Sequence, residues 1–243
     1  MKKLILATSA LALTAGMAMA DGHAKTIRLG TEGAFPPYNF LDDKGEVAGF
    51  EREVGDELCV RAELTCEWVT NEWDSIIPNL VSGNYDVIIA GMSITEERDE
   101  VIDFSDPYTQ PDPSSFVSTS ADVDLSTAII AAQTGTIQAS HVASMAGATL
   151  VEFATPEETV AAVKNGEADA VLADKAFLLP VSEADADLSL VGDDILLGGG
   201  IGLGIRESDG DLREKFNAAI QSMKDDGTLN ALIEKHLPGA AAF

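Results

Sequence analysis

The sequence has few basic residues, few histidines and few cysteines. Its 243 residues include 15 lysines and arginines against 41 aspartates and glutamates, a net charge of −26. Binding to nucleic acid or to an anionic membrane requires a cluster of positive charge, so the composition excludes both partners. Two cysteines and three histidines are too few for a multi-cysteine zinc site or a disulfide-dense miniprotein. Hydrophobic residues make up 46% of the chain, which is typical of a globular protein.

The sequence also lacks the motifs of common nucleotide-binding and hydrolytic sites. The glycine-rich segment 198–204 has no register that gives G-x-G-x-x-G, because Leu203 or Ile205 stands where the last glycine is needed. There is no GK[ST] loop, no HExxH and no G-x-S-x-G. His141 and His236 have no acidic or cysteine partner at metal-ligand spacing. We therefore expect no cofactor, no metal and no catalysis.

Residues 1–20 have the features of a signal peptide. Lys2 and Lys3 precede the apolar run Leu4–Ala15, and Ala18-Met19-Ala20 offers the small residues that a signal peptidase reads. A transmembrane anchor is the alternative, but the run is shorter than the ~20 residues that span a bilayer. We expect cleavage after Ala20 and secretion of a soluble chain. Loss of the two lysines changes the net charge from −26 to −28.

Cys59 and Cys66 are the only cysteines and lie seven positions apart. In an oxidising compartment we expect them to form one disulfide, and two reduced, buried thiols are the alternative. Closing so short a loop stabilises the fold by only ~2–3 kcal/mol in the chain-entropy model. Catalytic use is not expected, because no spacing ties either cysteine to a histidine.

Strands and helices alternate along the secreted chain, which predicts an α/β fold. In the first half we expect strands at 26–31, 64–69 and 85–90 and helices at 47–59 and 73–82. After a crossover rich in proline and serine at 107–120, we expect strands at 128–132, 150–153 and 168–173 and helices at 138–145 and 156–166. A second, glycine-rich crossing at 198–204 leads to two helices within 212–237, broken at Gly227.

Two crossings between two α/β units predict that the chain leaves one lobe, builds a second and returns. We expect lobe one to comprise residues 21–112 and 203–243 and lobe two residues 113–202. Each lobe should contain a mostly parallel sheet flanked by helices.

Polar groups follow the buried strand expected at 85–90. In α/β sheets, ligands bind beyond the carboxyl ends of the strands, where Ala90-Gly91 can offer backbone carbonyls and Ser93 a hydroxyl. Arg98 follows and can hold a carboxylate with two parallel hydrogen bonds. In the alternative interpretation, Arg98 pairs with a neighbouring carboxylate, Asp103 or Asp106. Spacing alone leaves the two interpretations open.

Three further residues have a similar choice of roles. Asp174 follows the strand expected at 168–173, where it can accept an ammonium group or cap the next helix. Phe35 and Trp73 stand between loops and helices. Core packing is the default for both rings, whereas a pair of rings facing a cleft would enclose a flat or aliphatic ligand.

Taken in order, the segments of this chain resemble the family-3 extracellular solute-binding proteins, the polar amino-acid-binding receptors of bacterial ABC uptake systems. The resemblance runs from Ile27 to Leu237. It is carried by the order and spacing of short motifs: RLGTE (28–32), PYNF (37–40), GFE (49–51), WDSIIPNL (73–80), YDVI (85–88), SIT (93–95) with Glu97-Arg98, IDFSDPY (102–108), QTGT (133–136), ADAVLAD (168–174) and DGT (226–228). Cys59 and Cys66 also fall where basic-amino-acid binders of this family carry a disulfide.

The resemblance implies a type II periplasmic binding protein in which two hinge strands join two lobes that close over an amino acid. It implies that Arg98 binds the ligand carboxylate, with Ser93 and the backbone amides of Thr136 and Ile137. It also implies a role for each remaining pocket residue: Asp174 with a carbonyl of Ala90 or Gly91 for the α-ammonium, Phe35 and Trp73 beside the side chain, and Glu32, Gln133 and Gln138 at its far end. The implied partner is an inner-membrane ABC permease, and we expect a periplasmic monomer.

The ligand class follows from the departures within this resemblance. Glu32 precedes Gly33, as in binders of arginine and its opine derivatives, and a carboxylate at the far end favours a cationic side chain. We expect a basic amino acid, arginine or ornithine before lysine or histidine. Ala90-Gly91 also resembles glutamine binders, and Phe35 replaces a common tyrosine, so a glutamine receptor is one alternative. The other is an enzyme on the same fold, similar to cyclohexadienyl dehydratase.

Overall fold

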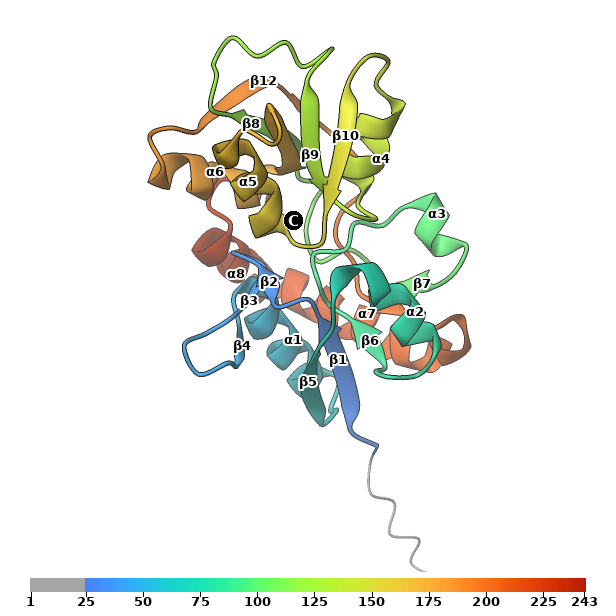
Figure 1. Ribbon diagram of the computed structural model, residues 1–243. Helices are drawn as coiled ribbons and strands as arrows, with labels where there is room; N and C mark the ends of the chain where they lie inside the picture. The colour runs from blue at the N-terminus through green and yellow to red at the C-terminus, as the bar shows by residue number, and fades with distance from the viewer. Residues whose placement is uncertain (1–24) are drawn as a thin grey trace, which may run out of the picture.

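The computed structural model describes residues 25–243, so the expected signal peptide at 1–20 lies outside the described residues. The chain forms two lobes, each built on a five-stranded sheet (Figure 1). The sheet of lobe one contains, in spatial order, β5 (Cys66–Thr70), β1 (Ile27–Thr31), β6 (Val87–Ile88), β13 (Gly204–Ile205) and β7 (Asp103–Phe104). The sheet of lobe two contains β10 (Thr149–Phe153), β9 (Ile129–Gln133), β11 (Ala170–Asp174), β8 (Ser114–Ser118) and β12 (Ser189–Ile195).

In both sheets four of the five strands run in the same direction, in agreement with the mostly parallel sheets that the sequence predicted. In lobe one, β5, β1 and β6 pair in parallel, and β13 pairs antiparallel with β6 and β7. In lobe two, β10, β9 and β11 pair in parallel, and β8 pairs antiparallel with β11 and β12. The reversed strands β8 and β13 are the first strands that the chain enters after each crossing. In each sheet the reversed strand is the fourth of five and separates the parallel strands from the edge strand, β7 or β12.

The two crossings, residues 105–113 and 196–203, lie side by side. The backbone N–H of Tyr108 donates to Ile201 O at 2.8 Å, and that of Ser105 donates to Leu203 O at 3.0 Å. Apart from a bridge between Ser93 and Ile201, neither segment has a regular strand, so the expected hinge strands are irregular connections. The lobe boundaries expected at 112/113 and 202/203 stay predictions.

The expectation that 107–120 is only a crossover is wrong, because it contains β8. All five residues of β8 are buried although three of them are serines. Their hydroxyls are satisfied within lobe two: Ser118 Oγ donates to Asp169 O at 2.6 Å, and Ser115 Oγ donates to Asp194 Oδ1 at 2.6 Å. Hydrogen bonds of this kind allow a serine-rich segment to occupy a buried strand.

The helix expected from Val47 begins at Phe50 instead. Val47–Ala48 is strand β4, which pairs with β3 (Asn39–Leu41), and β3 pairs with β2 (Ala34–Phe35). Gly49, with φ 107°, then turns the chain into α1 (Phe50–Arg61). A Cβ at Gly49 would lie 2.7 Å from Tyr38 O, so only glycine fits at this turn.

The helices expected at 73–82, 138–145, 156–166 and within 212–237 are present with their ends shifted by a few residues, and two further helices had no predicted range. Lobe one contains α2 (Ile76–Val81), preceded by a 3₁₀ turn at Trp73–Ser75, and the four-residue α3 (Glu96–Asp99). It also contains α7 (Gly210–Asp225), after a 3₁₀ turn at Glu207–Asp209, and α8 (Thr228–His236), and left-handed Gly227 separates this pair as expected. Lobe two contains α4 (Ile137–Ser144), α5 (Pro156–Asn165) and α6 (Lys175–Ala184). α5 has the expected cap at Thr155, which forms a capping box with Glu158.

Lobe one has supports that lobe two does not share. The predicted disulfide is present and joins Cys59 of α1 to Cys66 of β5. Asp86, whose side chain is 1% exposed, forms ion pairs with Lys25, Arg28 and Arg206, which keep the pKa of its carboxyl well below the ordinary range.

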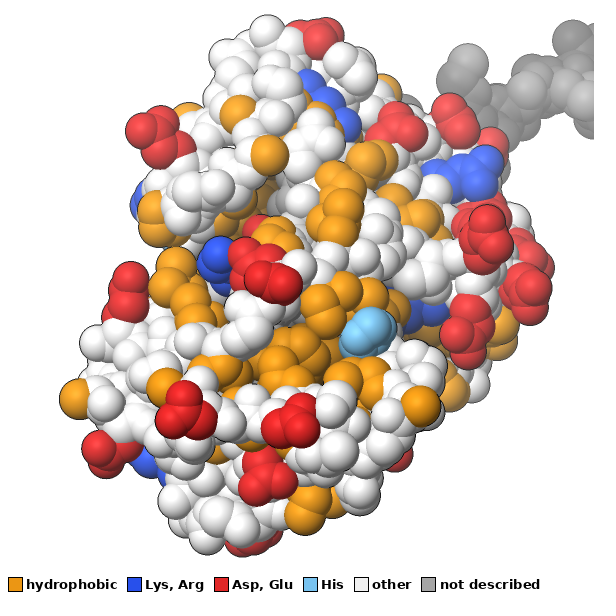
Figure 2. All heavy atoms as spheres, turned by 90° about the horizontal axis from the view of Figure 1, so that it is seen from above, with side chains coloured by type: hydrophobic (Ala, Val, Ile, Leu, Met, Phe, Trp, Pro, Cys, Tyr) orange, Lys and Arg blue, Asp and Glu red, His pale blue; other side chains and the backbone are white. Residues whose placement is uncertain are grey.

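Acidic side chains are dispersed over the face shown in Figure 2, where few basic ones appear. Among residues 25–243, no helix has the length and apolar character needed to cross a bilayer.

Candidate ligand-binding site

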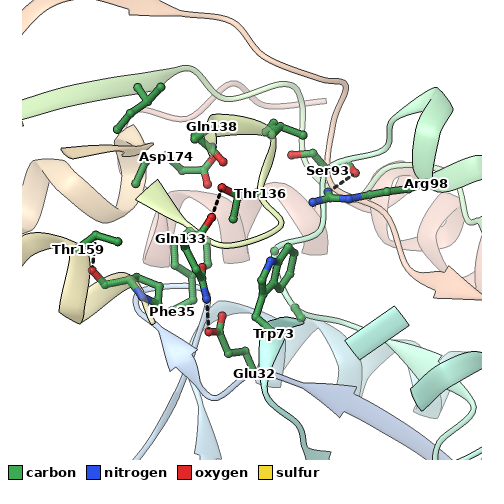
Figure 3. Close-up of a pocket in the computed structure, with 16 residues that line it drawn as sticks. Glu32, Phe35, Trp73, Ser93, Arg98, Gln133, Thr136, Gln138, Thr159 and Asp174 are labelled. Atoms are coloured by element: carbon green, nitrogen blue, oxygen red, sulfur yellow. Dashed lines mark hydrogen bonds between the residues drawn. The ribbon is translucent and has the colours of Figure 1, made fainter. Parts of the chain in front are cut away.

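One pocket lies between the two lobes, at the carboxyl ends of their parallel strands (Figure 3). Glu32 follows β1, Ala90 follows β6, Gln133 ends β9 and Asp174 ends β11. The pocket and its mouth hold about 490 Å³ of empty space. All twelve pocket residues singled out from the sequence line it: Glu32, Phe35, Trp73, Ala90, Gly91, Ser93, Arg98, Gln133, Thr136, Ile137, Gln138 and Asp174.

Four lining residues were not anticipated. Leu172 and Ala173 belong to β11, directly before Asp174, and Pro156 and Thr159 belong to the first turns of α5. The proline at the start of a well-capped helix was visible in the sequence. What could not be seen is that this helix starts at the pocket, because that depends on the packing of α5 against the sheet of lobe two.

Arg98 lies on the lobe-one side, in the short helix α3. The side chain of Thr95 caps this helix by accepting from the backbone N–H of Arg98. The guanidinium donates to Ser93 O at 2.9 Å and, across the pocket, to Gly135 O at 3.4 Å. It also lies over the Trp73 ring, 5.3 Å from the ring centroid. Burial lowers the pKa of Arg98 to about 10, although the charges of Asp174 and Glu97 oppose this shift.

The alternative pairing of Arg98 with a neighbouring carboxylate is not found. Asp103 instead pairs with Arg213, at 2.5 Å. Asp106 donates its backbone N–H to the side chain of Asn217 and forms no ion pair with Arg98. Within the described residues, the hydrogen bonds of the Arg98 guanidinium go only to backbone carbonyls. Its charge therefore has no directly bonded carboxylate and is available to an anionic ligand group.

Asp174 lies on the lobe-two side, at the end of β11. It occupies the N-cap position of α6, but its side chain makes no capping hydrogen bond, so the capping interpretation fails. Burial raises the pKa of Asp174 to about 7, the charge of Asp112 raises it further, and Arg98 opposes both. A cationic ligand group placed beside a buried carboxyl group with a raised pKa stabilises its ionised form.

Glu32 and Gln133 form the far end of the pocket and connect the two lobes. Gln133 Nε2 donates to Glu32 Oε1 at 2.6 Å and to Ala154 O at 3.0 Å. Burial raises the pKa of Glu32 to about 7, although the hydrogen bond from Gln133 opposes the shift. Gln138, expected at this same end, lies instead beside Asp174 (Figure 3), and its Nε2 donates to Ser114 Oγ at 3.0 Å.

The aromatic residues serve the core and the pocket together. Phe35, which is 7% exposed, stacks on Tyr38 at a centroid distance of 5.2 Å and an interplanar angle of 6°. Its ring centroid also lies 5.5 Å from that of Phe177 in lobe two. Gly91 has a φ of 63°, and a Cβ at this position would lie 2.9 Å from the Phe35 ring. The close approach of Gly91 to this ring therefore requires glycine.

Helix α4 begins at the pocket and completes its lobe-two side. Its N-cap, Thr136, accepts from the backbone N–H of Ala139 at 3.1 Å. The first backbone N–H groups of an α-helix have no partner within the helix and favour a negative charge. The start of α4 and Arg98 thus offer hydrogen-bond donors to the same pocket from opposite lobes.

Two mixed α/β lobes that enclose a charged pocket define the fold of a type II periplasmic binding protein. The bacterial extracellular solute-binding proteins of family 3 match residues 27–239, and the chain belongs to this family. None of the folded elements described above lies outside the matched residues.

Three related proteins illustrate the comparison. The L-arginine-binding protein of Pseudomonas aeruginosa is 31% identical, over 97% of this chain and 96% of its own. The structure of a periplasmic His/Glu/Gln/Arg/opine family-binding protein from Silicibacter pomeroyi in complex with lysine has a TM-score of 0.88 and 67% identity, over 90% of this chain and 100% of its own. An ancestral amino-acid-binding protein, a precursor of cyclohexadienyl dehydratase, has a TM-score of 0.76 and 29% identity, over 87% and 94%.

Proposed function

We propose that this chain is the periplasmic receptor of an ABC importer and closes on an L-amino acid with a cationic side chain, arginine or ornithine before lysine or histidine. One observation carries the proposal: a single pocket contains Arg98 from lobe one, Asp174 from lobe two and Glu32 at its far end. These are the three charges that a basic amino acid needs as partners. The arginine-binding relative and the lysine-bound relative support the same ligand class.

Each pole of the ligand has an opposite partner in this arrangement. Arg98, Ser93 and the backbone N–H groups of Thr136 and Ile137 bind the α-carboxylate. Asp174 and a carbonyl of Ala90 or Gly91 bind the α-ammonium. The aliphatic part of the ligand lies between Phe35 and Trp73, and its cationic end meets Glu32 and Gln133. Pairing of every buried charge offsets the cost of removing it from water.

Binding and closure are coupled because the partners belong to different lobes. A ligand held by Arg98 and Asp174 together favours the closed arrangement over the open one, since only closure brings both groups to it. The closed arrangement is then the signal that an inner-membrane permease reads. Lobe one comprises residues 21–112 and 203–243 in this proposal, lobe two comprises 113–202, and cleavage after Ala20 releases a periplasmic monomer.

Calorimetric titration with arginine, ornithine, lysine, histidine and glutamine tests the ligand class. We expect the tightest binding for arginine or ornithine. Tight glutamine binding without arginine binding would overturn the basic-ligand proposal. Incubation with prephenate and arogenate tests the enzyme alternative, and we expect no product, because Glu32 and Asp174 both have charge-pairing roles. Formation of a decarboxylated or dehydrated product would contradict the assignment as a receptor.

A further inference from the structure

Glu51, in the first turn of α1, is a fully buried carboxyl group that does not line the pocket. Its Oε1 accepts from the backbone N–H of Gly91 at 2.6 Å and from the hydroxyl of Tyr108. Its Oε2 accepts from Asn39 Nδ2 at 2.7 Å. No lysine or arginine among the described residues forms an ion pair with it. Three hydrogen-bond donors therefore take the place of a cation.

Each of these donors leads to a different part of the ligand-binding apparatus. Gly91 lines the pocket directly. Asn39 extends the network to Gly33, whose backbone N–H donates to Asn39 Oδ1 at 2.7 Å, and Gly33 is the neighbour of Glu32. Tyr108 belongs to the crossing between the lobes. We call the segments around Gly33 and Gly91 the lobe-one wall of the pocket. One buried side chain thus connects both parts of this wall to the crossing between the lobes.

Backbone conformation explains why the wall needs such a connection. Gly33 and Gly91 have φ values of 73° and 63°, which favour glycine. Glycine also makes the backbone permissive, so its freedom alone does not fix where a neighbouring carbonyl or side chain points. A hydrogen bond from each glycine N–H to a rigid acceptor supplies the missing restraint.

We propose that Glu51 is a positioning residue: through Gly91 and through Asn39 and Gly33 it holds the lobe-one wall of the pocket in its binding geometry, and through Tyr108 it ties that wall to the crossing. The affinity readout rests on the proposed function, because it uses arginine as the ligand. Hydrogen exchange at the Gly33 and Gly91 amides needs no ligand and reports on the wall directly.

The variant Glu51→Gln keeps the shape of the side chain and replaces one acceptor with a donor. If the new amide oxygen keeps Gly91 and Tyr108, the new amide nitrogen faces Asn39 Nδ2, so two donors meet. Asn39 must then turn over, and the N–H of Gly33 loses its acceptor. We expect the Gly33 amide to exchange at least tenfold faster and arginine affinity to fall at least tenfold.

The double variant Asn39→Asp with Glu51→Gln exchanges the two groups and restores the network. The new amide donates to the new carboxylate, whose second oxygen accepts from Gly33. We expect slow exchange at Gly33 and arginine affinity within threefold of the wild type. Asn39→Asp alone places two carboxylates together and should weaken binding. Val54→Ala, on the same helix and equally buried, is the control: it should lower thermal stability and leave affinity within twofold.

The outcomes separate the two proposals. If Glu51→Gln binds arginine as Val54→Ala does, with Gly33 exchange unchanged, the positioning role is overturned. It is also overturned if the double variant folds but restores neither the exchange protection nor the affinity. If the wild-type protein binds no basic amino acid, the proposed function fails, and the exchange of Gly33 and Gly91 in the same variants still decides the role of Glu51.

Discussion

The two lobes share the same strand order and differ in the side chains that follow the carboxyl ends of their strands. Strand β1 of lobe one occupies the same place in its sheet as β9 of lobe two, and β6 occupies the same place as β11. Helix α1 connects β1 to β5 as α4 connects β9 to β10. The equivalent strand ends face each other across the pocket, and Glu32 after β1 is hydrogen bonded to Gln133 at the end of β9.

The chemistry at these equivalent positions is not equivalent. Lobe one supplies Arg98, Glu32 and the two flanking rings, and it also contains the buried hydrogen bonds of Glu51 and the disulfide. Lobe two supplies Asp174 together with the starts of α4 and α5. The shared strand order therefore places equivalent strand ends on the two sides of the pocket. The side chains at those ends decide what the pocket binds. Four predictions test this division, from the largest expected effect to the smallest.

Replacing Arg98 with alanine removes the cation that only lobe one provides. We expect arginine affinity to fall by ~2–5 kcal/mol, roughly 30- to 4,000-fold, because the ligand carboxylate is left without its charged partner. Titration calorimetry measures the change. Arg213→Ala is the matched control, since it breaks the partly exposed pair with Asp103 and leaves the pocket intact. An Arg98 variant that binds within fivefold of the wild type would show that the clamp is wrongly assigned.

Replacing Cys59 and Cys66 with serine removes a support that lobe one alone possesses. The loop between them is short, so we expect the free energy of unfolding to fall by ~2–3 kcal/mol. Neither cysteine lines the pocket, so arginine affinity should stay within twofold. Denaturant titration and calorimetry on the same sample measure the two quantities. A tenfold loss of affinity would mean that the stability of lobe one and the geometry of the pocket are not separable.

Replacing Glu32 with glutamine makes the strand ends of β1 and β9 chemically alike. We expect arginine affinity to fall by ~1–2 kcal/mol, because a hydrogen bond to a charged group is exchanged for a neutral one. Glutamine affinity should not fall, so the ratio of the two affinities is the decisive measurement. Glu72→Gln is the control, since Glu72 lies near Glu32 but outside the pocket. An unchanged ratio would remove Glu32 from the specificity of the site.

Acidification should weaken ligand binding and strengthen the ligand-free fold. Glu32 and Asp174 have pKa values of about 7, and a cationic ligand needs both ionised. Between pH 8 and pH 6.5 we expect a loss of arginine affinity of ~4-fold for each group, under ~1 kcal/mol. Both pKa values are raised on folding, so the protonated forms favour the folded state, and the ligand-free protein gains stability as the pH falls toward about 5. From pH 8 to pH 6.5 the melting temperature of the ligand-free protein should therefore rise, whereas that of the arginine-saturated protein should stay nearly constant, because the weaker binding offsets the gain of the fold.

The parallel strands of both sheets and most of the longer helices could be predicted because their signals are local. Gly227 ended one helix, Thr155 and Pro156 began another, and the apolar run at 85–90 marked a buried strand. Strand β8 could not be predicted, because serines indicate a loop until the carbonyl of Asp169 and the carboxylate of Asp194 are known to accept from them. Strand β12 is largely exposed at the edge of its sheet, so no apolar alternation marked it.

The candidate site was accessible from the sequence for a different reason. Arg98 and Asp174 were candidates because each follows a buried strand of its own lobe, and the family resemblance placed the two in one pocket before the fold was known. The position of Gln138 could not be predicted, because it depends on which way α4 turns its first residues. Glu51 gave no signal either, since a glutamate in the first turn of a helix is ordinary and its burial is a tertiary property.

The neighbouring positions of Tyr108 and Ile201 make lobe two a candidate for exchange between relatives. It is one uninterrupted stretch of chain whose entrance and exit are hydrogen bonded to each other, so both junctions of a graft would fall at a single spot. Transplanting that stretch from a relative would replace Asp174, Gln133 and the start of α4 together and leave Arg98 and Glu32 unchanged. Chimeras of this kind would combine the pocket residues of two relatives and show which lobe determines ligand specificity.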